Sequence, residues 1–353
     1  MTGRLYPLTA RRDRAEQRHT FACFGGECTV IVADSLRSAD AAAAAAMAQR
    51  ALLTWHTRFS RFRSDSELSR LNRDPSPTVA VSPLLRRMIE LARQAARDTG
   101  GLVDVTLGDE IARAGYSAHF EGEGTALAVA LASAPPRAPA SPHLDERWRQ
   151  ISIDPRRGTV SRPPGLQIDV GGIAKGVFAD ELSSMLDGFD AFVVDCAGDL
   201  RAGGRSHLRR RVHLTSPFDG ARLHTFRVAD GGVATSGIGR RSWTVRGGQP
   251  GHHLLDPRTG APAFTGVVQA TALAPTAAQA EVLAKAAVLS GPARAAEWLR
   301  YGGLVVRDDG GYELLEPAGS GTEAAARTDS QAQISSSTVS RSGSLRISWK
   351  RPG

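Results

Sequence analysis

Residues 168–176 read IDVGGIAKG, and this stretch is the strongest indication of architecture in the chain. It predicts a short strand that ends at Asp169, a turn made by the glycine pair, and a helix with Lys175 in its first turn. Glycines let the backbone approach a ligand, and the free amides of a helix start attract anions. A lysine there opposes the helix dipole, which indicates a phosphate or another anion between it and the backbone. The alternative is a glycine-rich turn with a solvated lysine, since neither standard phosphate-loop pattern fits.

Outward from this stretch, hydrophobic periodicity and capping residues predict further elements. We expect a strand over 28–33, a helix that Ser38 caps and that continues past Trp55, and a helix that Ser82 caps and Gly100 ends. The remaining expected elements are strands over 192–195, 267–274 and 304–306 and helices over 173–187, 276–290 and 292–300. Because strands and helices alternate without a regular βαβ period, we predict an α+β fold, with a mixed or antiparallel sheet core and flanking helices.

Composition divides the chain into one large domain and two tails. Residues 1–20 are rich in arginine and are predicted to be a flexible lead-in, and residues 21–316 are predicted to form the domain. Within it, residues 121–143 are rich in Ala, Pro and Gly and are predicted to be a loop-bearing insertion. Residues 317–353 are rich in Ser, Thr and Gly and are predicted to be disordered.

Charge is concentrated in the two tails. The chain has 353 residues and a net charge of +8, of which residues 1–20 and 317–353 carry +3 each. A nucleic-acid-binding protein concentrates positive charge on its folded surface, so we expect no nucleic-acid partner. Of the 44 basic residues only three are lysines, namely Lys175, Lys285 and Lys350. Because a basic residue in this chain is almost always arginine, Lys175 and Lys285 inside the domain are candidate functional residues.

No apolar run is long enough to span a bilayer, and the N-terminus has no hydrophobic segment typical of a secretory signal. The three cysteines at 23, 28 and 196 form no C-x-x-C pair, so they indicate neither a disulfide framework nor a zinc site. These features predict a cytoplasmic protein without a transmembrane segment.

Four further segments could carry chemistry. Residues 251–260 (GHHLLDPRTG) contain adjacent histidines, which point to opposite faces of an extended segment, so at most one can face a site. Residues 59–72 (FSRFRSDSELSRLN) contain Phe62, which either stacks on a flat ligand or belongs to the core. Residues 101–106 (GLVDVT) follow a helix end and are predicted to enter a strand, and residues 234–237 (ATSG) are a weak signal alone.

In this order and spacing, the segments resemble the ApbE family, the FAD:protein FMN transferases, over about residues 22–315. Residues 59–72, 101–106, 169–176, 198–201, 235–237 and 253–260 match motifs of that family. The resemblance implies an α+β, T-fold-like protein that binds FAD. It also implies that the FMN half of FAD is moved onto a Ser or Thr hydroxyl of an acceptor protein, with release of AMP and with help from a divalent metal, Mg²⁺.

The resemblance also implies roles for individual residues. Phe62 would stack near the isoalloxazine ring, and Leu102, Val103, Asp104 and Leu254 would line the cofactor pocket. Asp169 and Lys175 would contact the cofactor, Lys175 through the diphosphate. Phe24 stands where the family has Met, and this match is poor. His253 is our candidate for activating the acceptor hydroxyl, because a neutral imidazole accepts a proton near pH 7.

One departure from the family concerns the metal. Where the family has Asp-x-x-x-Thr, this chain has Glu281 and Lys285, and a charged lysine cannot ligate a cation. Three alternatives follow. In the first, the two side chains form an ion pair on an exposed helix face, worth about 0.2–0.5 kcal/mol, and the metal site is lost. In the second, the Lys285 ammonium takes the metal's place. In the third, the metal stays on Glu281, the backbone near Gly172 and the phosphates. Lys285 is therefore a catalytic candidate, Gly172 and Glu281 are metal candidates, and a catalytically impaired FAD-binding relative is the alternative function.

Overall fold

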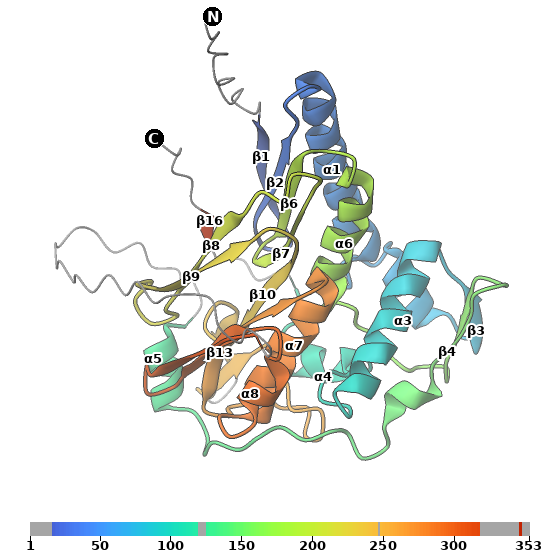
Figure 1. Cartoon of the computed structure of the whole chain (residues 1–353). Coiled ribbons are helices and arrows are strands. Elements are labelled where there is room, and N and C mark those ends of the chain that lie inside the picture. Colours follow the sequence, from blue (N-terminus) through green and yellow to red (C-terminus); the bar gives the residue numbers. More distant parts are fainter. Residues whose placement is uncertain (1–15, 119–124, 246–247, 318–345, 348–353) are drawn as a thin grey trace, which may run out of the picture.

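The computed structural model describes residues 16–118, 125–245, 248–317 and 346–347. At its centre is an antiparallel sheet of eight strands in the order β1-β2-β6-β7-β10-β13-β14-β15 (Figure 1). The strand bounds are β1 Glu16–Cys23, β2 Gly26–Ala33, β6 Ala191–Cys196, β7 Asp199–Gly203, β10 Gly231–Gly237, β13 Val267–Ala274, β14 Gly303–Arg307 and β15 Tyr312–Leu315. Every neighbouring pair in this sheet is antiparallel, so the predicted α+β class with an antiparallel core is confirmed.

Three helices cover one face of the sheet (Figure 1). Helix α1 (Ser38–Phe59) packs on β1 and β2, α6 (Ala174–Leu186) on β6 and β7, and α7 (Ala277–Ser290) on β10 and β13. Helices α6 and α7 also pack against each other, which brings the IDVGGIAKG segment next to the helix that carries Glu281 and Lys285.

The opposite face of the sheet packs against a hairpin of β8 (Arg210–Thr215) and β9 (Arg222–Val228). Strand side chains alternate between the two faces: Val194 of β6 lies in the core beneath α1 and α6, whereas Val193 shares a second core with Val212 and Leu214 of β8. Because both faces are covered, β6 is buried along its whole length. This double burial explains why residues 191–194 of β6 are a continuous apolar run.

The remaining elements lie outside the eight-stranded sheet, and all of them except α3 are short. The helices are α2 Glu67–Arg73, α3 Pro83–Asp98, α4 Gly108–Arg113, α5 Leu127–Ala132, α8 Ala295–Trp298 and the 3₁₀ turn Arg147–Gln150. The strands are β3 Thr78–Ala80, β4 Ser152–Asp154, β5 Thr159–Ser161, β11 Ser242–Thr244, β12 Pro250–His252 and β16 Arg346–Ile347. Among the described residues, no helix is long and apolar enough to cross a membrane, and all three cysteines are buried free thiols.

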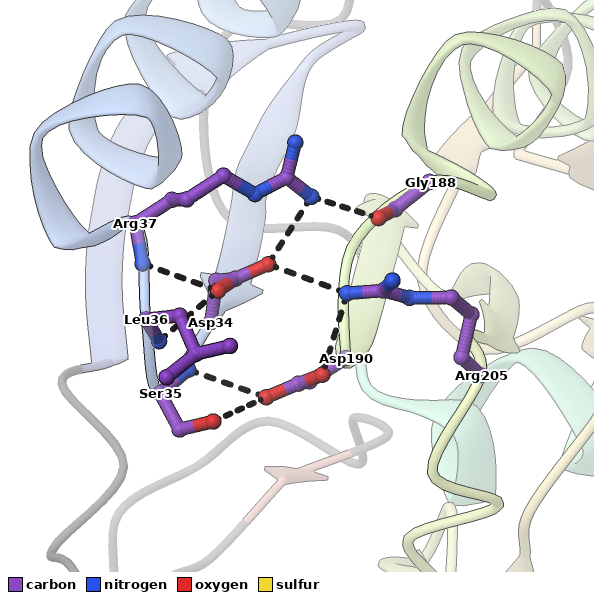
Figure 2. Close-up of polar contacts among 7 residues, drawn as sticks. All are labelled: Asp34, Ser35, Leu36, Arg37, Gly188, Asp190 and Arg205. Atoms are coloured by element: carbon purple, nitrogen blue, oxygen red, sulfur yellow. Dashed lines mark hydrogen bonds and ion pairs between the residues drawn. The ribbon is translucent and has the colours of Figure 1, made fainter.

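A buried carboxylate fixes the junction between β2 and α1 (Figure 2). Asp34 accepts hydrogen bonds from the amides of Leu36 and Arg37, both at 2.9 Å, and from the Arg37 side chain at 3.1 Å. Asp190, which precedes β6, accepts from the Ser35 amide at 2.9 Å, and Arg205 contacts both carboxylates. The turn into α1 is thus tied to the neighbouring β6 and to the segment after β7.

Most predicted elements are present, with changed bounds. The helix expected from Ser38 begins there, but the residue in the N-cap position is Arg37, and its side chain makes no capping hydrogen bond. Ser82 does cap α3 as expected, accepting from the Leu85 amide. The helix expected over 292–300 is only the single turn Ala295–Trp298.

Two expected strands are absent from the described structure, those ending at Asp169 and following Gly101. The backbone of Ile168 is instead hydrogen-bonded to the side chain of Asn72. That side chain donates to the Ile168 carbonyl at 2.8 Å and accepts from the Ile168 amide at 2.9 Å. The Asp169 amide donates to the Val105 carbonyl at 2.8 Å. A side chain replaces the strand partner here, so the segment is extended without belonging to a sheet.

The expected domain bounds can be compared only where residues are described. Residues 16–20 of the expected lead-in belong to β1, and residues 1–15 lie outside the described structure. The expected insertion over 121–143 includes α5, and residues 119–124 are not described. In the tail predicted to be disordered, Arg346–Ile347 pair with β8, while residues 318–345 and 348–353, including the 335–338 serine-threonine run, lie outside the described residues.

Candidate functional site

A cavity of about 860 Å³ opens where two hairpin turns of the sheet meet the start of α6. The turns are Phe24–Gly25, between β1 and β2, and Ala197–Gly198, between β6 and β7. All four residues have positive φ, from 56° to 106°, as a tight two-residue hairpin turn requires. The turns lie side by side, since a Cβ on Gly26 would stand 3.0 Å from the Cβ of Ala197.

One group of side chains consists of aromatic rings and an arginine; Arg61, Phe62 and Tyr116 line the cavity, and Trp243 lies behind Tyr116. Tyr116 stacks on Trp243, with ring centroids 5.5 Å apart and planes 15° from parallel, and Phe62 meets Tyr116 edge-on at 5.2 Å. The Arg61 guanidinium lies 4.2 Å from the Phe62 ring centroid and 4.8 Å from that of Tyr116. We call these four residues the aromatic group. It offers flat surfaces and a cation of the kind on which a ring system stacks.

A second group, the charged cluster, consists of Lys175, Asp199, Glu281 and Lys285. Lys175 and Asp199 form an ion pair across α6 and β7, with side chains 16% and 1% exposed. Asp199 thus places a carboxylate of the chain beside Lys175, and the contact of Lys175 with a bound phosphate stays a prediction. The Lys285 ammonium donates to the Gly172 carbonyl at 2.9 Å and lies 3.8 Å from Glu281 Oε1.

Close helix packing holds Glu281 in the cluster. Its Oε2 accepts a hydrogen bond from the Gly176 amide in the first turn of α6 at 2.9 Å. This approach requires glycine, because a Cβ at position 176 would stand 2.6 Å from the backbone of Ala278. The side chains of Glu281 and Lys285 are only 3% and 14% exposed, so the alternative that places this pair on an exposed helix face is wrong.

Burial and the opposing charges shift the pKa values of the cluster. Burial opposes the charge of Lys175, but the carboxylates of Asp199 and Glu281 outweigh it and raise the lysine's pKa. Burial, with help from the nearby Asp199 carboxylate, raises the pKa of Glu281. Burial lowers the pKa of Lys285, and Glu281 and Asp199 oppose that shift. Burial also raises the pKa of Asp195, on the neighbouring strand, to about 7.

His253 lies between the two groups. Its ring centroid is 6.5 Å from that of Tyr116, and the charges of Arg241, Lys285 and Lys175 act on its imidazole. Burial, reinforced by these cations, holds the pKa of His253 well below its usual range, so the ring is neutral at neutral pH. Among the described residues, its Nδ1 is buried and has no hydrogen-bond partner.

Its neighbour His252 points the other way. The side chain of His252 is 1% exposed and meets the Phe264 ring edge-on at 4.7 Å. Because only His253 of the two lines the cavity, the expectation that at most one histidine faces the site is met.

The other sequence-predicted site residues also line this cavity: Phe62, Leu102, Val103, Asp104, Asp169, Gly172 and Leu254. Asp104 uses Oδ1 to accept from the amide and hydroxyl of Thr106, whereas its Oδ2 is buried and unpaired within the described structure. Burial raises the pKa of Asp104. Asp169 accepts from the Gly171 amide at 2.7 Å and faces Arg61 at 3.3 Å, so it shapes the glycine turn. The contacts of these residues with a cofactor stay predictions.

Sequence reasoning missed several residues that line the cavity, among them Tyr116, Asp199, Arg240 and Arg241, and it missed Trp243, which stacks on Tyr116. Asp199 could have been found, because it belongs to the Gly-Asp-hydrophobic-Arg motif. Arg240 and Arg241 follow the Thr-Ser-Gly motif, but nothing in their spacing marks them. Tyr116 and Trp243 meet only through long-range packing, which also makes the Trp243 indole donate to the Ala114 carbonyl at 2.9 Å.

The residues expected to hold a divalent metal do not suit one in this arrangement. The Gly172 carbonyl already accepts from the Lys285 ammonium, and Glu281 divides its two oxygens between the Gly176 amide and that ammonium. A cation bound to the same carbonyl would share it with a positive charge, and repulsion between unit charges about 4 Å apart costs about 4 kcal/mol even at an effective dielectric constant of 20. A charged lysine offers no lone pair to a metal.

The fold and the cavity together define an antiparallel α+β protein whose site combines aromatic surfaces with cations that line the cavity, the combination that suits a nucleotide. The chain belongs to the ApbE family, whose model matches residues 24–306. It is 28% identical to a FAD:protein FMN transferase of Klebsiella pneumoniae, over 70% of this chain and 71% of that protein. It is 29% identical to one of Treponema pallidum, over 67% and 68% of the two chains.

Solved structures share the fold. A crystal structure of the ApbE protein of Thermotoga maritima superposes with a TM-score of 0.69 at 23% identity, covering 85% of this chain and 97% of that one. The flavinyl transferase ApbE of Pseudomonas stutzeri superposes with a TM-score of 0.66 at 22% identity, covering 86% and 94%.

Proposed function

We propose that this protein is a FAD:protein FMN transferase, which moves the FMN half of FAD onto a Ser or Thr hydroxyl of an acceptor protein and releases AMP. The observation that carries the proposal is the position of His253, a neutral imidazole in one cavity with a stacking surface and a group of cations. Membership of the ApbE family and the names of the curated relatives support the same activity.

The two groups of side chains would bind different parts of FAD, the ring system and the diphosphate. The aromatic group offers a surface for the isoalloxazine ring, and the unpaired Oδ2 of Asp104 offers an acceptor to a ring N–H. Lys175, Lys285 and the two arginines Arg240 and Arg241 face the same cavity and suit the negative charge of the diphosphate.

The transfer itself is a phosphoryl-type displacement. The acceptor hydroxyl oxygen bonds to the phosphorus of the FMN half, and the bond from that phosphorus to the bridging oxygen breaks, so that AMP leaves with the bridging oxygen. The hydroxyl proton passes to His253, which is neutral and therefore able to accept it. Such a reaction depends mainly on positioning and on stabilising charge, and the cations that line the cavity supply the latter.

The test uses purified protein, FAD and a set of Thr-containing peptides, with mass spectrometry of the peptides and chromatography of released AMP. We expect one peptide class to gain the mass of one FMN moiety as AMP is released in equal amount. FAD binding without AMP release, with no peptide modified, would identify a catalytically impaired FAD-binding relative instead.

The role of His253 has its own prediction. The His253→Ala variant is expected to bind FAD with an affinity within about threefold of the wild type and to transfer FMN at least about 100-fold more slowly, the usual cost of losing a general base. Isothermal titration and single-turnover AMP release separate the two quantities. Wild-type transfer by this variant would remove His253 from the mechanism.

A further inference from the structure

We propose that the ammonium group of Lys285 is the permanent cation of the phosphate site, in the place of a divalent metal, so that FAD binding here is independent of divalent metal ions. The inference rests on the proposed function, because it specifies how the same site neutralises the diphosphate of FAD. It concerns this chain in particular, since the Glu281 and Lys285 pair departs from the pattern of its family.

The first support is the position of the ammonium. Lys285 donates to the Gly172 carbonyl at 2.9 Å, and Gly172 belongs to the glycine pair that turns into α6. Glu281 Oε1 faces the same ammonium at 3.8 Å. The lysine therefore reaches both oxygen donors that the sequence predicts for the metal, and it holds α7 against the turn before α6 in the way that a bridging metal does.

The second support is that Glu281 is fully engaged. One oxygen accepts from the Gly176 amide at 2.9 Å and the other faces Lys285, while the carboxylate is 3% exposed. Within the described part of the chain, no group of three or more His, Cys, Asp or Glu side chains could hold a metal ion. The alternative in which Glu281 keeps a metal therefore requires Lys285 to leave its carbonyl partner.

The third support is the charge balance. Four cationic side chains line this part of the cavity: Lys175, Lys285, Arg240 and Arg241. Asp199 and Glu281 oppose them most directly, and the lining as a whole contains five basic and five acidic residues, which include Arg61, Asp104, Asp169 and Asp219. The cavity therefore has no excess of positive charge, and Lys285 is one of the few cations available to offset the two negative charges of the FAD diphosphate. Replacing Lys285 by a neutral residue would leave this balance one charge short.

The experiment measures FAD affinity and metal binding separately. Isothermal titration of the wild type with FAD is run in EDTA and in millimolar MgCl₂, and Mn²⁺ binding is followed by electron paramagnetic resonance with and without FAD. We expect the two FAD dissociation constants to agree within about twofold. We also expect no stoichiometric binding of Mn²⁺ to the protein. A tenfold loss of FAD affinity in EDTA, or one bound Mn²⁺ per chain, would overturn the proposal.

Variants at the two positions provide the reciprocal test. Lys285→Met keeps the length of the side chain without its charge, and we expect about tenfold weaker FAD binding or worse, which Mg²⁺ does not restore. The double variant Glu281→Asp/Lys285→Thr restores the family's ligand pair, and we expect it to bind one Mn²⁺ and to need Mg²⁺ for FAD binding. Arg294→Met, at a site that is 61% exposed, is the matched control and should match the wild type. Circular dichroism confirms that each variant is folded.

These results separate the inference from the proposed function. If the wild type binds no FAD under either condition, the proposed function fails, whereas Mn²⁺ binding to the wild type and to the double variant still decides whether Lys285 has displaced a metal. A double variant that folds but binds no Mn²⁺, beside a Lys285→Met variant that keeps wild-type FAD affinity, contradicts the inference and leaves the transferase proposal intact.

Discussion

At the scale of single residues, buried charges in this protein are stabilised by a partner of opposite sign. Lys175 and Asp199 are brought together from positions 24 residues apart, and the carboxylate is 1% exposed. A buried ion pair adds little net stability compared with an apolar pair, but the loss of one partner leaves an uncompensated charge. The pair therefore matters most for keeping the site in one arrangement.

Lys175→Met is expected to lower the free energy of unfolding by about 3 kcal/mol, because Asp199 is left buried and unpaired. The double variant Lys175→Met/Asp199→Asn, which removes both charges, should recover more than half of that loss. Urea unfolding followed by circular dichroism measures both. A double variant as unstable as the single one would show that packing, rather than charge, is what Lys175 contributes.

A second residue-scale prediction concerns pH and His252. Burial lowers the pKa of this histidine from its usual 6.5 to about 3, so between these values the unfolded chain binds a proton that the folded protein does not. Stability therefore falls as the pH falls from 6.5 toward 3, by about 1.4 kcal/mol per pH unit for this group. The pKa of Asp195, raised to about 7, has the opposite effect, because protonation of Asp195 increases stability as the pH falls from 7 to 4. The contribution of His252 is therefore isolated only by comparing the wild type with a His252 variant.

That comparison uses His252→Asn, unfolded in urea at pH 7 and pH 4.5. The wild type should lose about 2–3 kcal/mol more than the variant on acidification, because the variant has no imidazole to protonate. Equal losses in the two proteins would mean that His252 is protonated in the folded state as easily as in the unfolded chain.

At the scale of elements, the contact between α6 and α7 positions the site. Gly176 lets the two helices approach, and Glu281 on α7 accepts from its amide. Asp180 on α6 accepts from the Ala277 and Ala278 amides at 2.8 and 2.9 Å, so one helix caps the other. The turn before α6 and the charged cluster are therefore held by the same packing.

Gly176→Ala is expected to destabilise the protein by about 2 kcal/mol or more and to weaken FAD binding, because the new Cβ lies 2.6 Å from the backbone of Ala278. Gly188→Ala is the matched control, since a Cβ there meets nothing within 4 Å. It should stay within about 0.5 kcal/mol of the wild type. Thermal unfolding and FAD titration of both variants test this, and equal behaviour of the two would contradict the proposed packing role.

At the scale of the whole molecule, the cavity joins distant parts of the chain. Its lining runs from Phe24 in the first hairpin to Leu289 near the end of α7, and it includes the β6–β7 turn and the start of α6. A ligand that fills this space contacts both cores and the helices on one face of the sheet. Binding and global stability should therefore be strongly linked.

FAD at 100 times its dissociation constant is expected to add about 2.7 kcal/mol to the free energy of unfolding. For a chain of this size that corresponds to a rise of about 4 °C in Tm. Circular dichroism at rising FAD concentration measures it, with riboflavin, which lacks the phosphates, as the control. A larger shift with riboflavin than with FAD would mean that the cations do not bind the diphosphate.

The sequence by itself determined the class of fold, most of the long elements and the family, because periodicity, caps and short motifs are local properties of the chain. It also singled out a part of the cavity lining, including Phe62, His253 and Lys285. It could not show that the strand expected at Asp169 is replaced by Asn72 hydrogen bonds, or that Tyr116 and Arg240 line the site and Trp243 stacks behind Tyr116. The contact between Lys285 and Gly172, 113 residues apart, was decided only by the packing of α7 on α6, since charge and burial at one position depend on what the rest of the chain places beside it.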